Sequence, residues 1–328
     1  MGNSNSSRNS SRKSSRNKIS KKKSLQKLNN SESTKQQQTY DPSSSFQIPK
    51  NEQDIDRMQL EHFLFQHIWQ CCFSSPIEQI LKAGNAKVLD VGCGPGAWLL
   101  GTSLKYPLTQ FYGIDIAPVF PKEIKPENLE FIQSDIANGI RFDDNTFDFV
   151  RMNLLSTSLQ EDQWACVIEE LVRVLKPGGY IEIMEPEFQF YNIGPYFSKL
   201  NSNLVDFISS TGANIHITQK IESILNMPNF QTSSQTDVNL CNTLSKLTDI
   251  HTDTRTIPIG GVHGGKIGKI YEELLGMYFE NTVLDILPWY MGTSRENYLE
   301  LWKLCQEEFK NYASFTNLVK FWGKKVAE

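Results

Sequence analysis

The stretch "KVLDVGCGPGAW", residues 87–98, decides the fold. A hydrophobic run that reads as a β-strand ends within it, and Gly92, Gly94 and Gly96 then occupy alternate positions. Glycines at this spacing indicate a backbone that turns tightly or lies close against another group, because glycine adopts positive φ at little cost. The stretch therefore predicts a strand, a tight loop and the start of a helix.

Strand and helix patterns alternate after this point. Strands are expected at 87–92, 110–115, 129–135, 147–153 and 180–185, and helices at 97–105, 118–124 and 161–175. A helical pair over 54–82, interrupted at Pro76, precedes them, and two more strands are expected at 250–259 and 315–325. Such alternation favours a parallel sheet with helices on both faces. We predict an α/β, Rossmann-like, doubly wound seven-stranded sheet, mostly parallel with the last strand antiparallel, and helical cap segments at about 196–227 and 266–311.

Four polar residues close successive strands of this predicted sheet. They are Asp90, Asp115, Asp135 and Asn153. Ligands of open α/β sheets bind outside the carboxyl ends of the strands, so these side chains are expected to line one crevice.

The loop also satisfies the dinucleotide fingerprint GxGxxG/A, but that signal alone is weak. Asp90 lies two residues before the first glycine, where its charge would oppose a pyrophosphate and favour a ligand that carries an ammonium group. Gly96 makes the loop GxGxG, and Asp135 offers a carboxylate where an adenine amino group could lie. These features favour another ligand over a nicotinamide dinucleotide.

Four segments together resemble the motifs of class I S-adenosylmethionine-dependent methyltransferases. They are "VLDVGCGPGAW", "YGIDIAP", "FIQSDIANGIRFDDNTFDFVRMNLL" and "LVRVLKPGGYIEIMEP". "DRMQLEHFLFQHIW", "APVFPKEIKPENLEFI" and "GGKIG" are most similar to fungal methyltransferases of the secondary-metabolism-regulator type. The resemblance implies S-adenosyl-L-methionine as the cofactor and core motifs within 86–186.

The resemblance also implies roles for individual residues. The glycine loop would surround the methionine part of the cofactor, with Asp90 near its amino group, and Asp115 would hold the ribose hydroxyls. Asn153 and Leu154 would border the methyl group, and "LKPGG" would be a structural turn into strand five. The full predicted cofactor-binding set is Asp90, Gly92, Cys93, Gly94, Gly96, Asp115, Ile116, Ser134, Asp135, Ile136, Asn153 and Leu154.

Structural alternatives remain for several of these residues. Asp115 could cap the following helix, and Asp135 could be a turn residue. Cys93 is expected to be merely small. His263 and Glu185 are weak candidates for a base, so the catalytic residue stays unassigned, and the histidines show no metal-ligand spacing. "GGVHGGKI", 260–267, lacks the Ser/Thr of a phosphate loop and is expected to be a mobile loop beside the acceptor, with His263 and Lys266 facing the cleft.

The net charge of −4 is unevenly distributed. Residues 1–40 carry ten Lys/Arg and one Glu, or +9, so the remainder carries −13. We predict a disordered basic tail over 1–50 and a methyltransferase domain over 51–328. "MGNSNS" fits N-myristoylation at Gly2, which with the basic tail predicts peripheral membrane contact. An unmodified tail and a nuclear-import signal are the alternatives. Without a signal peptide, a cytoplasmic protein is expected.

The acidic body argues against a nucleic-acid partner, and the aromatic "LPWYMG", 287–292, favours an apolar small-molecule acceptor. Three functions are weighed. The first is a methyltransferase that acts on an unidentified acceptor. The second is a regulatory protein that keeps the cofactor site and acts through partners. The third, a nicotinamide oxidoreductase, is disfavoured by Asp90.

Overall fold

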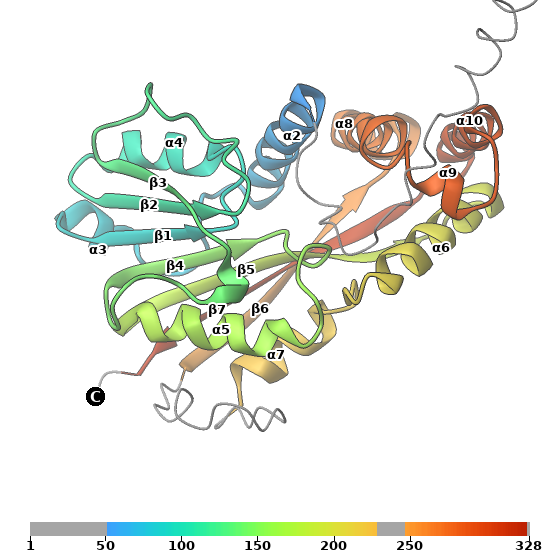
Figure 1. The fold of residues 1–328 in the computed structure, drawn as a ribbon. Helices are drawn as coiled ribbons and strands as arrows, with labels where there is room; N and C mark the ends of the chain where they lie inside the picture. The colour runs from blue at the N-terminus through green and yellow to red at the C-terminus, as the bar shows by residue number, and fades with distance from the viewer. Residues whose placement is uncertain (1–50, 228–246, 327–328) are drawn as a thin grey trace, which may run out of the picture. The chain divides into compact units, whose positions relative to one another are not determined.

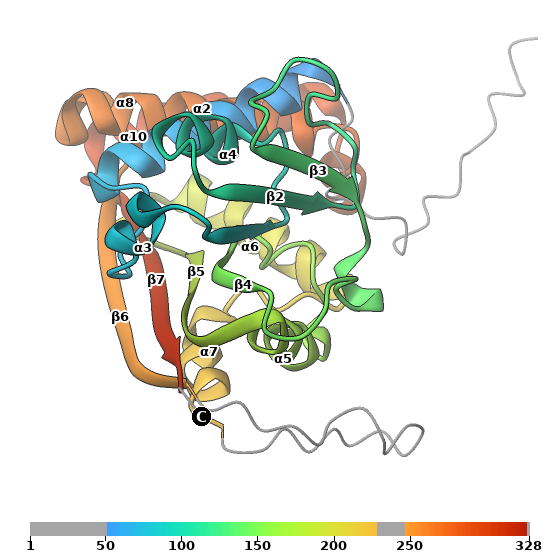
Figure 2. The same ribbon diagram turned by 90° about the vertical axis from the view of Figure 1, so that its left-hand side faces the viewer.

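The strands of the computed structural model, which describes residues 51–227 and 247–326, form one seven-stranded sheet. The order across the sheet is β3-β2-β1-β4-β5-β7-β6 (Figures 1 and 2). Neighbours from β3 to β5 pair in parallel, and β7 runs antiparallel to both β5 and β6. This confirms the predicted sheet. The strands are β1 Lys87–Val91, β2 Gln110–Asp115, β3 Leu129–Gln133, β4 Phe147–Asn153, β5 Leu175–Tyr191, β6 Leu247–Pro258 and β7 Phe315–Lys325.

Helices cover both faces of this sheet (Figure 2). One face packs on α5, Gln163–Val174, and α7, Thr218–Leu225, through residues that include Leu89, Val150 and Ile181. The opposite face packs on α3, Glu78–Ala83, and α4, Ala97–Lys105, through residues that include Val88, Phe111 and Phe149. Successive side chains of a strand point to opposite faces, which is why neighbours such as Val88 and Leu89 enter different cores.

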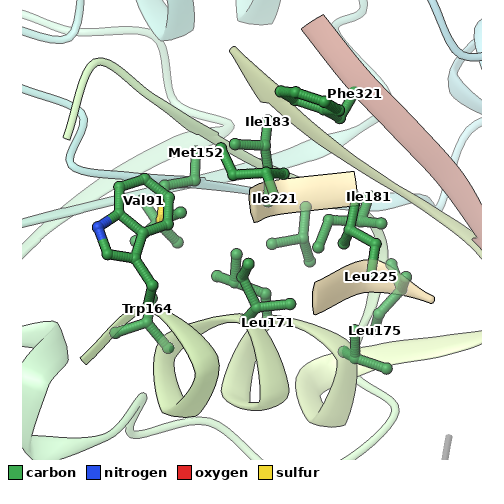
Figure 3. Close-up of a cluster of buried hydrophobic side chains, with 14 of the residues drawn as sticks. Val91, Met152, Trp164, Leu171, Leu175, Ile181, Ile183, Ile221, Leu225 and Phe321 are labelled. Carbon is green, nitrogen blue, oxygen red and sulfur yellow. The ribbon is translucent and has the colours of Figure 1, made fainter. Parts of the chain in front are cut away.

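The α5 face holds the larger hydrophobic cluster (Figure 3). Trp164 and Leu171 of α5 point toward strand residues such as Met152 and Ile183, all fully buried. The apolar residues of α5 recur every three to four positions, so one stripe of the helix meets the sheet. This packing fixes β1, β4 and β5 side by side and so holds their carboxyl ends in place.

A second group of helices forms the cap. It comprises α2 Glu52–Trp69, α6 Pro195–Ser210, α8 Gly261–Met277, the π-helical turn η2 Tyr278–Thr282, α9 Leu287–Tyr290 and α10 Arg295–Asn311. Aromatic contacts join α6, η2 and α10, because Phe197 packs against Phe279 and Phe309, and Phe279 stacks on Trp302. In Figure 1 this group lies to the right of and above the sheet, and α2 lies beside α8.

Several sequence predictions about elements were wrong. Residues 118–124 form no helix, because Pro118, Pro121 and Pro126 interrupt the segment with a restricted backbone. "LKPGG" is not a turn before strand five but part of β5, with an irregular register opposite β4 and Gly178 at φ +81°.

The two long cap segments are also divided. Residues 196–227 split into α6 and α7, with Gly212 at φ +88° between them, and the second cap segment begins earlier than expected, at Gly261. "GGVHGGKI" is therefore no mobile loop but the start of α8, interrupted by the non-helical Gly265. Glycine allows that interruption because it tolerates φ +59°.

The basic tail and Gly2 lie outside the described residues, and their properties stay predictions.

Among the helices of 51–227 and 247–326, none combines the length and apolar character that a bilayer crossing needs.

Candidate functional site

The glycine loop between β1 and α4 adopts the conformation that its sequence predicted. Gly92, Gly94 and Gly96 have φ of +68°, +51° and +76°. Their amides are already bonded within the protein: Gly92 and Cys93 donate to the Ile114 carbonyl, Gly94 donates to Asp115, and Gly96 donates to the Cys93 carbonyl. A loop that binds a pyrophosphate presents free amides. This loop therefore does not offer the amides of a dinucleotide cradle.

Asp115 ends β2 and bridges two segments of the site. Its Oδ2 accepts from the Gly94 amide at 2.7 Å, and its Oδ1 accepts from the Ala117 amide at 2.8 Å. Burial raises the pKa of this carboxyl, while the backbone hydrogen bonds oppose the rise. The alternative that Asp115 caps a following helix is wrong, because no helix lies among the described residues between β2 and β3; its bond to Ala117 closes a local turn. Ribose binding stays a prediction, to which the remaining lone pairs of a half-buried carboxylate are suited.

A cavity of about 250 Å³ lies at the carboxyl ends of β2 and β3, and its lining begins at Ile116, the residue that follows Asp115. Ile116, which is 47% exposed, lines it. Ser134, Asp135, Gln133, Asn138 and Arg141 complete the lining. The strand prediction for Asp135 was wrong by two residues, since β3 ends at Gln133.

Asp135 instead caps the short helix η1, Ile136–Asn138, by accepting from the Ala137 amide at 3.0 Å. The predicted turn role is therefore present in the structure. Its Oδ2 also accepts from the Asn138 side chain. The cavity nevertheless brings Ile116, Ser134 and Asp135 together, as a shared adenine site requires.

Asp90 does not close its strand, contrary to the sequence reading. It lies inside β1, 3% exposed, and both of its oxygens accept from Arg151 of β4 at 3.1 Å. The guanidinium of Arg151 also lies over the Trp98 ring, 4.3 Å from its centroid. Because Arg151 compensates the charge, the argument that Asp90 repels a pyrophosphate is wrong. A contact between Asp90 and a ligand amino group stays a prediction.

Glu185 fixes the segment that follows β4 through two hydrogen bonds from backbone amides. This carboxylate is fully buried and accepts from the Leu155 amide at 2.8 Å and the Ser156 amide at 3.0 Å. Burial raises the pKa of Glu185 to about 7. Leu154 has φ +61°, a sparsely populated conformation for a residue with a side chain. Within residues 51–227 and 247–326, the buried Oδ1 of Asn153 has no hydrogen-bond partner. A strained residue and an orphan acceptor together mark this strand end as a binding position.

Helix α2 lies over these strand ends. The Cε atom of Met58 would be 2.7 Å from a Cβ placed on Gly94, so the helix approaches the glycine loop closely. One turn further, Glu61 pairs with Arg57 at 3.2 Å. Burial, together with the nearby Arg151 charge, lowers the pKa of His62 to about 4.

The remaining candidates lie elsewhere or act structurally. His263 and Lys266 are exposed on the first turns of α8. Burial raises the pKa of the Cys93 thiol, which disfavours a nucleophilic thiolate. Trp289 of "LPWYMG" is 65% exposed. Across the described ranges, no cluster of three or more His, Cys, Asp or Glu side chains could hold a metal ion.

Sequence reasoning missed Arg151, Arg57, Glu61 and Tyr278. A signal existed for three of them. Arg151 is a charged residue inside an apolar strand, which requires a buried partner. Arg57 and Glu61 have the i,i+4 spacing of a helical ion pair. Tyr278 had no signal, because its approach to α2 depends on the path of the chain through the cap.

Comparisons with known proteins agree with this geometry. Residues 88–179 match the model of a family described as a methyltransferase domain. That range runs from β1 into β5 and includes the glycine loop, Asp115, Asp135 and Asn153. Residues 88–179 therefore form a methyltransferase domain similar to those of class I. This confirms the resemblance seen in the sequence, and this class uses S-adenosylmethionine as methyl donor.

Two curated relatives match part of the methyltransferase chain. The secondary metabolism regulator laeA of Coprinopsis cinerea is 28% identical over 161 residues, which cover 48% of this chain and 40% of the relative. The N-methyltransferase verN of Clonostachys rogersoniana is 29% identical over 146 residues, which cover 43% of this chain and 50% of the relative. The chain thus spans half or less of the length of these relatives.

One solved structure that aligns with this chain is phosphoethanolamine N-methyltransferase 2 of Haemonchus contortus, in complex with S-adenosyl-L-methionine. The two chains are 17% identical, and the alignment covers 80% of this chain and 56% of the other, with a TM-score of 0.41.

The residues at the strand ends fit S-adenosylmethionine. The donor carries a permanent sulfonium charge and a neutral nucleoside, so it needs carboxylates and close backbone rather than an arginine clamp. Asp115 and the cavity lined by Ile116, Ser134 and Asp135 would hold the nucleoside. The orphan oxygen of Asn153 lies at the end of β4.

Proposed function

We propose that the protein is an S-adenosylmethionine-dependent methyltransferase that acts on a small molecule. The observation that carries the proposal is the juxtaposition of Asp115 with a cavity lined by Ile116, Ser134 and Asp135, inside the methyltransferase domain. In this arrangement Asp115 holds the ribose hydroxyls and Ile116 packs on the adenine. Asn153 and Leu154 border the reacting centre.

The bound donor supplies an activated methyl group, and the protein supplies alignment. Methyl transfer is an in-line displacement, so positioning of the acceptor contributes most of the rate. Glu185 fixes the backbone of Leu155 and Ser156 and thereby the conformation of Leu154. The helix α2 covers the loop at Gly94 and reduces access of water to the site.

Calorimetry with three ligands tests the proposal. We expect the full-length protein to bind S-adenosylmethionine and its demethylated product, and to bind NAD much more weakly. Asp115→Asn should weaken binding of both by about 1–3 kcal/mol, because a charge-assisted contact to the ribose is lost. Asp143→Asn, which changes an exposed carboxylate in a loop, is the matched control. Tighter binding of NAD would overturn the proposal.

The alternative is a regulatory protein that binds the donor but acts through partners. The regulator names among the relatives favour it as a second candidate. Incubation with labelled S-adenosylmethionine and a metabolite extract separates the two functions. Donor binding without label transfer to any small molecule would favour the regulatory function.

A further inference from the structure

A cluster of polar side chains where α2 meets α8, η2 and β5 has no role in the donor site, apart from the backbone contacts of Glu185. We call it the α2 cluster: Arg57 and Glu61 on α2, Tyr271 on α8, Tyr278 on η2 and Glu185 at the carboxyl half of β5. Glu61 is its centre, because it pairs with Arg57 and acts electrostatically on Tyr271, Tyr278 and Glu185. Burial raises the pKa of the Glu61 carboxyl, and Arg57 opposes that rise.

Two buried polar atoms of the α2 cluster have no hydrogen-bond partner in the part of the chain that the structure describes. They are the hydroxyl of Tyr278 and the Nε of Arg57. A buried polar group without a hydrogen bond destabilises the folded state, so such groups in a native protein call for an explanation. The Tyr278 ring faces the guanidinium of Arg57, whose carbon lies 5.6 Å from the ring centroid. The two orphan atoms therefore lie in one neighbourhood, beside the Glu61 carboxylate.

The α2 cluster adjoins the position proposed for the methyl group. Met58, which neighbours Arg57 on α2, reaches the glycine loop at Gly94. Asn153 points to the same face of the sheet as Arg151, two residues earlier in β4, and the charge of Arg151 reaches His62 of α2. Glu185, a member of the cluster, holds the segment that follows Asn153.

The charges of the cluster favour a cationic ligand. It holds two carboxyls, Glu61 and Glu185, and one guanidinium, that of Arg57, which pairs with Glu61. The orphan oxygens of Tyr278 and Asn153 can accept hydrogen bonds. When both carboxyls are ionised they outnumber the guanidinium, and acceptor atoms with a net negative charge suit a ligand that donates N–H bonds and carries positive charge.

We propose that the α2 cluster binds an amine acceptor and that Glu61 takes a proton from its nitrogen. The inference rests on the proposed function and specifies its substrate class. The bound ammonium gives one proton to the Glu61 carboxylate, which frees the nitrogen lone pair. That lone pair forms the bond to the methyl carbon, and the methyl–sulfur bond breaks with its electron pair kept by sulfur. The product is a protonated N-methylamine.

Benzylamine, benzyl alcohol and benzoate are suitable probes, because they share size and ring and differ in the polar group. Calorimetry with the full-length protein saturated with S-adenosylhomocysteine should show binding of benzylamine and at least tenfold weaker binding of the other two. Glu61→Gln should weaken benzylamine at least tenfold, and Tyr278→Phe about threefold, while S-adenosylhomocysteine binds both variants normally. Glu300→Gln, an exposed glutamate on α10, is the control and should change neither.

The pH dependence of benzylamine binding provides a second readout. The groups that face Glu61 are Arg57, Tyr271, Tyr278 and Glu185. Burial raises the pKa of both carboxyls, so benzylamine binding should weaken as the pH falls and the carboxyls take up protons. Glu61→Gln should make this profile shallower and leave only the part due to Glu185, near pH 7, a change that a purely structural role would not produce.

The outcomes separate the two proposals. If the wild type does not bind S-adenosylhomocysteine, the proposed function fails and the amine site fails with it. If S-adenosylhomocysteine binds but benzylamine does not, or if benzoate binds equally well, the amine site alone is wrong. Unchanged benzylamine binding by a folded Glu61→Gln protein would also overturn it.

Discussion

Replacing Arg151 with methionine directly tests how much the buried ion pair of Asp90 and Arg151 contributes to stability. The strand register places Asp90 of β1, Arg151 of β4 and Glu182 of β5 in one row across the sheet. Arg151→Met keeps an apolar stem of similar length over Trp98 but leaves the buried Asp90 carboxylate without its two hydrogen bonds. Removing one partner of a buried ion pair costs about 3–5 kcal/mol, a large fraction of the stability of a typical domain.

The pH dependence of that loss follows from the pKa of Asp90. Burial raises the pKa from 3.8 to about 6 even with Arg151 present. A carboxyl whose pKa is higher in the folded state contributes stability below its unfolded pKa and loses it as pH rises through the folded value. Without Arg151 the pKa should rise further. The variant should therefore be most destabilised near pH 8 and regain stability as the pH falls toward 5.

Urea unfolding, followed by circular dichroism at pH 5, 6.5 and 8, measures the effect. The double variant Asp90→Asn, Arg151→Met removes both charges and should be more stable than Arg151→Met alone at pH 8. Lys303→Met, at an exposed i,i+3 pair on α10, is the control for loss of a surface charge and should change stability by less than about 1 kcal/mol. An equally small loss for Arg151→Met, or a loss that does not vary with pH, would refute the reasoning.

Two further predictions concern the loop and the carboxyl beneath it. Gly94→Val should abolish binding of S-adenosylhomocysteine in calorimetry, because a side chain at this position meets Met58 and φ is +51°. The control is Gly178→Val, where φ is also positive but an added Cβ has no described atom within 4 Å. This control should lose stability and still bind S-adenosylhomocysteine. Glu185→Gln should flatten the fall in unfolding free energy between about pH 5 and 8, since the wild-type pKa of about 7 makes its stabilising contribution decrease as pH rises. Binding retained by Gly94→Val, or an unchanged pH profile for Glu185→Gln, would contradict these assignments.

The sequence alone determined the sheet and the glycine loop. Apolar periodicity and glycine spacing are local signals, and β2, β4, α4 and β7 occupy the residues that these signals predicted. The three loop glycines all have positive φ. Local signals sufficed because each glycine conformation and each alternating strand depends mainly on neighbouring residues.

Side-chain pairing required the tertiary structure. From the sequence, Asp90 was interpreted as an unpaired charge beside the glycine loop. Nothing in its own strand indicates its partner Arg151, which is 61 residues away. Asp135 read as a strand end, although its contacts with Ala137 and Asn138 make it a helix cap. In both cases the carboxylate takes the donor that the fold brings nearest.

The helical cap depended on the tertiary structure most of all. The sequence offered His263 as a histidine beside the acceptor, yet it lies exposed on α8. The polar groups that do converge, Glu61 and Tyr278, are separated by more than two hundred residues. Helical periodicity shows which face of each segment is apolar, but not which distant helix it will meet. That choice is made when the apolar faces of α2, α8 and η2 are buried together, and the polar side chains at their margins are brought into contact by the same packing.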